Sequence, residues 1–211
     1  IDEPFYAHYL SRTGADHPYR NETLAAYPSQ WPAVIDWIEA PPAGGQKLLF
    51  LKHIAYHLPD DVDFSFLLDH RNFLLIRDPR AMVASFADKL EDAAPIARSF
   101  AIERRIFEYL SARDFPCPVL DAADILKAPE PTLKALCAAL DIEFDQRMLS
   151  WAPGPRPEDG PWAPHWYDAV WASTGFKPYV EKKPKLSSAL EAVAARSTAD
   201  YRYLFDRRMT A

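Results

Sequence analysis

Cysteine, basic charge and long hydrophobic runs are all scarce in this chain, and each shortage excludes a class of protein. Cys117 and Cys137 are the two cysteines among 211 residues, and their spacing matches no metal motif. We therefore expect free thiols, no structural disulfide and a reducing cytoplasmic environment. Lysine and arginine total 24 against 30 aspartates and glutamates, and this net charge of -6 argues against a general binder of nucleic acid or of anionic membranes.

The chain also shows no signal peptide and no apolar stretch long enough to cross a membrane, so we expect a cytoplasmic protein. Hydrophobic residues make up 49% of the sequence and charged residues 26%, which is ordinary for a globular protein. One domain over residues 1–211 is therefore expected. The first residue is Ile1, and "IDEPF" reads as the end of a strand entering a loop, so we expect this domain to be truncated at its amino terminus.

Strand and helix patterns alternate along most of the chain. Short apolar runs predict strands at 47–52, 72–77 and 117–122, and helical spacing predicts helices at 29–40, 79 to about 90, about 95 to 113, 129–142 and about 185 to 208. Such alternation predicts an α/β fold in which helices cover both sides of a mostly parallel sheet.

The stretch "NFLLIRDPRAMVASF", residues 72–86, places Arg77 at the end of a predicted strand. Asp78 suits an N-cap and Pro79 suits the first helical position, because proline has no N–H to leave unpaired. Ligands of open α/β sheets gather at the carboxyl ends of the strands, and a helix start attracts anions. Arg77 is thus a candidate anion ligand, and Ser85, about two turns into the helix, could reach the same anion. Alternatively, Arg77 pairs with a carboxylate and Ser85 faces water.

Polar residues also follow the predicted strand at 47–52, where "LLFLK" ends in Lys52 and is followed by His53 and His57. A cation and an imidazole at a strand end could stabilise charge and accept a proton. The same residues could equally be ordinary polar residues of a loop.

The segments "DEPFYA", "LLFLKH", "NFLLIRDPRAMVASF" and "PVLDAADILKAPEPTLKALCAALDIEFDQRMLSW" together resemble the sulfotransferase family over about residues 1–151. The resemblance implies a three-layer, mostly parallel sheet flanked by helices, in a fold of the P-loop NTPase type. It implies transfer of a sulfuryl group from 3′-phosphoadenosine 5′-phosphosulfate (PAPS) to a hydroxyl or amine of a small-molecule acceptor, which leaves adenosine 3′,5′-bisphosphate. No metal, nucleic-acid or membrane partner is implied.

The resemblance also implies roles for individual residues. Arg77 and Ser85 match the family residues that bind the 3′-phosphate of the nucleotide. Lys52 matches the lysine that acts at the transferring group. The catalytic base matches either His53 or His57, because the spacing differs from that of the family.

Three features depart from the family pattern. The glycine-containing phosphosulfate loop is absent, Ala122 stands where a tyrosine near the adenine is common, and residues 173–183 only echo the basic segment that clasps the nucleotide. Two alternatives therefore stand beside the enzyme: a non-catalytic nucleotide-binding or interaction module of the same fold, and a small-molecule kinase, which would need a G-x-x-x-x-G-K-[ST] loop upstream.

Tryptophan is concentrated in the proline-rich stretch after residue 151. Four of the six tryptophans lie there, namely Trp151, Trp162, Trp166 and Trp171. This stretch could line an acceptor pocket, or it could cap the core.

Overall fold

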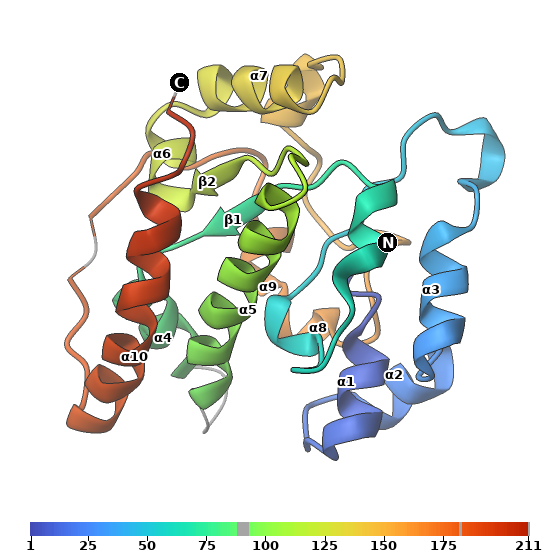
Figure 1. The fold of residues 1–211 in the computed structure, drawn as a ribbon, viewed down its shortest axis with the longest axis horizontal. Helices are drawn as coiled ribbons and strands as arrows, with labels where there is room; N and C mark the ends of the chain where they lie inside the picture. Colours follow the sequence, from blue (N-terminus) through green and yellow to red (C-terminus); the bar gives the residue numbers. More distant parts are fainter. Residues whose placement is uncertain (88–92, 182, 211) are drawn as a thin grey trace. The chain divides into compact units, whose positions relative to one another are not determined.

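The computed structural model describes residues 1–87, 93–181 and 183–210 (Figure 1). The chain divides into two compact units. Unit 1 consists of residues 1–62 and 153–172, whereas unit 2 consists of residues 63–152 and 173–211. Unit 1 is therefore made of two stretches of chain that are far apart in the sequence.

Unit 1 is helical. Its elements are α1 (Tyr6–Thr13), α2 (Arg20–Ala26), α3 (Trp31–Glu39), the 3-10 turns η1 (Ala43–Gly45) and η2 (Ala55–His57), and the short helices α8 (Ala163–Trp166) and α9 (Asp168–Trp171). The helix predicted at 29–40 is confirmed as α3, which has a proline in its first turn and buries Val34 and Ile38. Helix α1 ends at Gly14, whose φ of 69° lets its N–H reach the carbonyl of Leu10 at 3.1 Å.

The prediction of a buried strand at 47–52 is wrong. Lys52 alone forms an isolated parallel bridge, to Asp2, and within this stretch Leu48 and Phe50 are 56% and 60% exposed. The bridge consists of two backbone hydrogen bonds, from the Lys52 N–H to Ile1 O at 3.0 Å and from the Glu3 N–H to Lys52 O at 2.8 Å. An apolar run becomes a buried strand only where other elements cover it, and most of this run lacks such cover.

Unit 2 contains the parallel sheet and the longer helices. Its elements are η3 (Phe64–Asp69), β1 (Leu74–Ile76), α4 (Pro79–Ala87), α5 (Ala94–Ser111), β2 (Val119–Asp121), α6 (Ala122–Lys127), α7 (Pro129–Ala139), η4 (Gln146–Leu149) and α10 (Ser188–Phe205). The strands predicted at 72–77 and 117–122 are confirmed as β1 and β2, which are shorter. The last four helices predicted correspond to α4, α5, α7 and α10, although residues 88–90 of the first lie outside the described residues.

Strands β1 and β2 pair in parallel, with Leu74 opposite Val119 and Ile76 opposite Asp121. Successive side chains of a strand point to opposite faces of a sheet. In β2, Asp121 contacts α10, whereas the preceding Leu120 packs against residues of α7. Helices therefore cover both faces of the sheet at β2. Within the described residues, however, the sheet consists of only these two parallel strands, and most of the elements are helical, so the structure shows the predicted mostly parallel sheet only in part.

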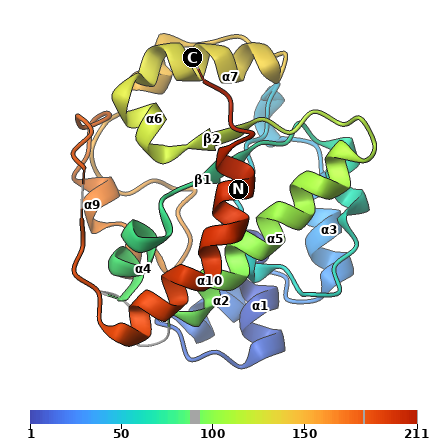
Figure 2. The same cartoon turned by 60° about the vertical axis from the view of Figure 1, so that its left-hand side comes forward.

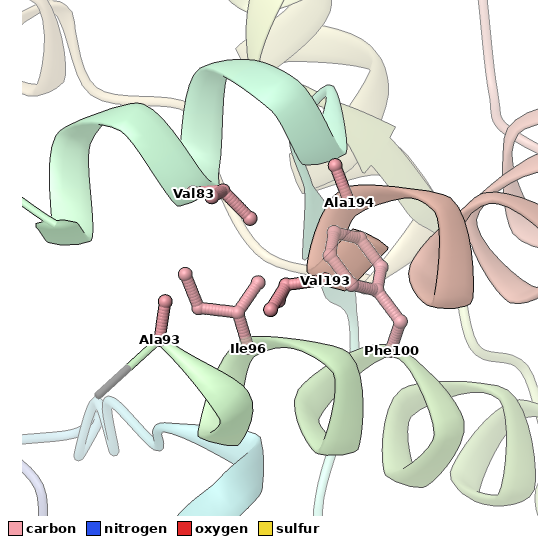
Figure 3. Packing of buried hydrophobic residues seen from close by; sticks show 6 residues of the cluster. All are labelled: Val83, Ala93, Ile96, Phe100, Val193 and Ala194. Carbon is pink, nitrogen blue, oxygen red and sulfur yellow. The ribbon is translucent and has the colours of Figure 1, made fainter. Parts of the chain in front are cut away.

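The main core of unit 2 lies between α4, α5 and α10, and α5 and α10 run side by side in both ribbon views (Figure 2). Its buried side chains are Val83, Ala93, Ile96, Phe100, Val193 and Ala194 (Figure 3). Helices that meet through small and branched side chains can approach closely, so α10, at the end of the chain, completes the core begun by α4 and α5.

Both cysteines are free thiols, as the sequence predicts. Cys137 is buried in α7, with its Sγ 3.8 Å from Met148 Sδ, and Cys117 is half-buried just before β2. Burial raises the pKa of the Cys117 thiol to about 12, so this thiol stays protonated at neutral pH.

Candidate functional site

Arg77 lies one residue beyond β1, at the carboxyl end of the parallel sheet of unit 2. Helix α4 begins at Pro79, and Asp78 caps it by accepting the N–H of Ala81 on Oδ1 at 2.9 Å. The strand end, the cap and the helix start around Arg77 are therefore as the sequence predicts.

The Arg77 guanidinium is half-buried, and it makes no hydrogen bond or ion pair with any residue in the described parts of the chain. Arg80, three residues later, differs because it pairs with Glu191 and donates to the carbonyl of Pro184 at 3.1 Å. The described residues thus do not support the alternative in which Arg77 pairs with a carboxylate. A cation beside a helix start favours an anion, and Ser85 offers an exposed hydroxyl on the same helix.

The end of β2 carries a buried carboxylate that sequence reasoning missed. Asp121 is 3% exposed, and its Oδ1 caps α6 by accepting the N–H of Ala123 at 2.8 Å. Its Oδ2 accepts the hydroxyl proton of Tyr201, on α10, at 3.0 Å. Burial and the neighbouring Asp121 raise the pKa of Tyr201, which therefore remains a donor. No local pattern could reveal this pair, because 80 residues separate the two positions.

Lys52 occupies a cluster of oxygen atoms in unit 1. Its Nζ lies 3.0 Å from Asp2 Oδ1, 2.6 Å from Glu3 Oε1 and 2.7 Å from the Tyr167 hydroxyl. Burial disfavours the charged lysine, but the Glu3 and Asp2 carboxylates outweigh burial and raise its pKa. Lys52 is therefore an ammonium ion, and its side chain remains 41% exposed.

Glu3 is the most confined member of this cluster. Its residue is 9% exposed, and its φ of 46° is rare for a side chain other than glycine. Burial raises the pKa of Glu3, although the ion pair with Lys52 opposes this effect. Such backbone strain persists only where surrounding contacts hold it, and here the bridge between Asp2 and Lys52 holds the backbone on either side.

His57 and His53 lie in different surroundings. The ring of His57, only 3% exposed, stacks on Tyr6 with centroids 4.6 Å apart and on Tyr9 at 5.0 Å, and it meets Tyr56 edge-on at 4.6 Å. His53 is half-buried, and its ring is tilted against Phe5 at 5.3 Å. His57 is thus enclosed by aromatic rings, whereas His53 is the more accessible imidazole.

A third histidine, which the sequence did not single out as a site residue, joins the same aromatic cluster. The Tyr6 hydroxyl lies 2.9 Å from His17 Nδ1. Burial lowers the pKa of His17, which favours the neutral ring. In the tautomer that carries its proton on Nε2, the Tyr6 hydroxyl donates to Nδ1. Unit 1 therefore gathers several imidazoles around one group of tyrosines.

The tryptophan-rich stretch supplies the Tyr167 of the Lys52 cluster. Trp162 is 1% exposed, and its ring meets Tyr6 edge-on at 5.0 Å and lies tilted against Tyr27 at 5.5 Å. For Trp162, this burial favours the core-capping alternative over an open pocket. Gly160 makes the packing possible, because a Cβ at this position would lie 2.2 Å from the Trp162 ring.

A sulfotransferase domain model matches residues 1–197 of the chain. The chain belongs to the sulfotransferase domain family. The resemblance found in the sequence is thereby confirmed, and membership implies a fold of the P-loop type.

Two curated relatives of this sulfotransferase domain are the "Branched-chain-amino-acid aminotransferase-like protein 2" and "protein 1" of Arabidopsis thaliana. Each is 36% identical over 177 residues, which are 83% of this chain but 31% of the relative. The chain thus spans about a third of the length of these relatives. No solved structure matches it significantly.

The residues predicted for the sulfotransferase site fall in both units. Lys52, His53 and His57 belong to unit 1, and Arg77 and Ser85 belong to unit 2. Tyr167 and the two carboxylates around Lys52 were missed as site residues, although "DEPFYA" and the tryptophan-rich stretch were both noted. Their pairing spans 115 residues between Lys52 and Tyr167, which no local spacing can reveal.

The described residues hold neither a metal-binding cluster nor a membrane-spanning helix. Across residues 1–87, 93–181 and 183–210, no group of three histidine, cysteine, aspartate or glutamate side chains is arranged to hold a metal ion. In the same residues, no helix has the length and apolar character needed to span a membrane.

Proposed function

We propose that this sulfotransferase domain transfers a sulfuryl group from PAPS to a hydroxyl or amine of a small-molecule acceptor. The observation that carries the proposal is Arg77, a guanidinium without a partner among the described residues, placed after β1 and before the capped start of α4. This arrangement suits an anion such as the 3′-phosphate of the nucleotide. We assign that phosphate to Arg77, together with the Ser85 hydroxyl.

In unit 1 we assign Lys52 to the transferring group, where an ammonium ion can stabilise developing negative charge. We assign the base to His53 rather than His57. A base must come within hydrogen-bonding distance of the acceptor proton, and His57 is 3% exposed inside a cage of tyrosines. Sulfuryl transfer, like phosphoryl transfer, depends mainly on positioning and charge stabilisation, and these residues supply both.

The proposal extends to the architecture. A single domain with a three-layer, mostly parallel sheet is the arrangement that a P-loop type fold favours, and helices on both faces of β2 support it. The curated relatives carry aminotransferase-like names and are longer, so amines are among the acceptors to be tried first.

A non-catalytic nucleotide-binding module is the second candidate. The observation that favours it is the pairing of Lys52 with two carboxylates, which reduces its attraction for an anion. Such a module would bind the nucleotide through Arg77 but would transfer nothing. A small-molecule kinase would instead require magnesium and would prefer a nucleoside triphosphate.

The first test is calorimetric binding of adenosine 3′,5′-bisphosphate and of adenosine 5′-phosphate to the full chain. We expect preference for the bisphosphate, and we expect Arg77→Ala to weaken its binding by about tenfold to a hundredfold, because a hydrogen-bonded charge is lost. Arg147→Ala is the matched control, since that arginine is 90% exposed and pairs with Asp145. Equal binding by Arg77→Ala and the unaltered chain would refute the phosphate assignment.

Turnover with PAPS and a panel of amines and alcohols then separates the enzyme from the module. Sulfated product that is lost in His53→Ala would support the enzyme and the assigned base. Bisphosphate binding without product from any acceptor would favour the module.

A further inference from the structure

We infer that Tyr167 is a positioning residue for Lys52, and this inference rests on the proposed sulfuryl transfer. Neither the family match nor the local sequence pattern assigns a role to this tyrosine. The role follows from the hydrogen bonds around Lys52, all of which lie within unit 1.

The direction of these hydrogen bonds is determined by chemistry. A lysine ammonium has three N–H donors and no acceptor, so the Tyr167 oxygen must accept from Lys52 Nζ at 2.7 Å. The single phenolic proton is then available to a carboxylate. Asp2 Oδ2 lies 2.6 Å from the Tyr167 oxygen and Glu3 Oε1 lies 3.3 Å away, so Asp2 is the acceptor.

The result is a closed ring of hydrogen bonds. Lys52 donates to Asp2 Oδ1, Tyr167 donates to Asp2 Oδ2, and Lys52 donates to Tyr167. Both oxygens of Asp2 are thereby engaged. Lysine has a flexible four-carbon stem, and three acceptors arranged around its Nζ hold it in one place.

Tyr167 also affects how much positive charge Lys52 presents. Asp2 and Glu3 carry two negative charges against the single charge of Lys52. The phenolic proton lies against Asp2 and offsets part of its charge, so the field of Lys52 is less completely cancelled than it would be by the two carboxylates alone. The 41% exposure of the lysine side chain leaves it open to a ligand.

The chain around Tyr167 is built to hold it still. Helices α8 and α9 flank it directly, and Trp162 anchors the start of this stretch in the aromatic cluster of unit 1. At the other end, Trp171 Nε1 donates to Asp159 Oδ2 at 2.8 Å, and the Gly154 N–H donates to the Trp171 carbonyl at 2.8 Å. These hydrogen bonds and the burial of Trp162 fix residues 154–171 in place, and the Tyr167 hydroxyl therefore has a defined position.

The test is Tyr167→Phe, which removes one oxygen and keeps the ring. The ring itself lies 5.0 Å from Lys52 Nζ, so that packing contact is retained. We expect kcat for sulfuryl transfer to fall by about tenfold, the effect of losing one hydrogen bond to a charged group, while the KM for PAPS stays within about twofold. Tyr19→Phe is the matched control, because Tyr19 is an exposed tyrosine of the same unit.

A second readout does not depend on turnover. Trace acetylation with acetic anhydride, followed by peptide mass spectrometry, measures how freely Lys52 reacts. We expect Lys52 to be acetylated several times faster in Tyr167→Phe than in the unaltered chain, and at the unaltered rate in Tyr19→Phe. If no acceptor is ever sulfated, the proposed function fails, but the acetylation rate still tests whether Tyr167 positions Lys52. Unchanged acetylation would overturn the inference, and so would faster acetylation with an unchanged kcat.

Discussion

Glu103 shows how burial alone changes the chemistry of one residue. It is half-buried in α5, next to the fully buried Ile102, and its carboxyl makes no ion pair or hydrogen bond with any residue in the described ranges. Burial raises the pKa of Glu103 to about 8 from an ordinary value near 4.5. The folded protein therefore holds this proton at neutral pH, whereas the unfolded chain releases it.

This difference makes stability depend on pH. Between pH 4.5 and pH 8 the unfolded chain loses the Glu103 proton and the folded chain keeps it, so the contribution of this group to the free energy of unfolding falls as pH rises. We expect Glu103→Gln to be more stable than the unaltered chain at pH 8, by at least about 1 kcal/mol, and equally stable at pH 4. Urea unfolding at both pH values measures this.

Glu108→Gln provides the control on the same helix, since Glu108 is 44% exposed and pairs with Arg104. It should leave the pH dependence nearly unchanged, because an exposed ion pair contributes little. A Glu103→Gln variant whose stability follows the same pH curve as the unaltered chain would show that Glu103 is ionised in the folded protein.

At the scale of elements, the packing of α4, α5 and α10 holds unit 2 together. Phe100 in α5 is completely buried, and its ring meets Tyr201 of α10 edge-on at 5.9 Å. Tyr201 in turn bonds Asp121 at the end of β2. One aromatic contact thus links the main helical core to the sheet edge that carries Arg77.

Removing the Phe100 ring should therefore have a large effect on stability. We expect Phe100→Ala to lower the free energy of unfolding by about 3 to 5 kcal/mol, because the ring leaves a cavity that the helices cannot close. For a chain of this size the melting temperature should fall by about 10 °C. Val180→Ala, at a position that is 70% exposed, should change it by less than about 2 °C. If Phe100→Ala lowered the melting temperature as little as Val180→Ala, the packing of α5 would not be what stabilises this core.

At the scale of the whole molecule, the division into two units bears on cooperativity. The chain passes between the units three times, after residues 62, 152 and 172, so unit 1 is completed only by a stretch that follows most of unit 2. The sulfotransferase match also runs through both units. Unit 1 therefore closes only when the intervening residues 63–152 are ordered, which favours a single unfolding transition.

Tryptophan fluorescence and far-UV circular dichroism can test this expectation on the unaltered chain. Five of the six tryptophans belong to unit 1, and only Trp151 belongs to unit 2, so fluorescence mainly reports unit 1. Circular dichroism reports the helices of both units. We expect the two urea transitions to coincide. Separate midpoints would show that the units unfold independently and would contradict a single domain.

Much of unit 2 and the family were accessible from the sequence by itself. Caps and helix starts are local, so Asp78 and Pro79 mark the beginning of α4 wherever the chain folds. The apolar runs around residues 75 and 120 likewise marked β1 and β2. Arg77 could be placed at a strand end for the same reason, because its position follows from its immediate neighbours.

Only the tertiary structure decided which distant residues meet. The run at 47–52 looks like the other strands, but burial depends on what covers it, and here Phe50 is exposed. The choice between His53 and His57 rests largely on the rings of Tyr6 and Tyr9, which come from α1, about 50 residues away in the sequence. Tyr167 reaches Lys52 across 115 residues of sequence. Local propensity carries no information about such contacts, because they arise from packing of the whole chain.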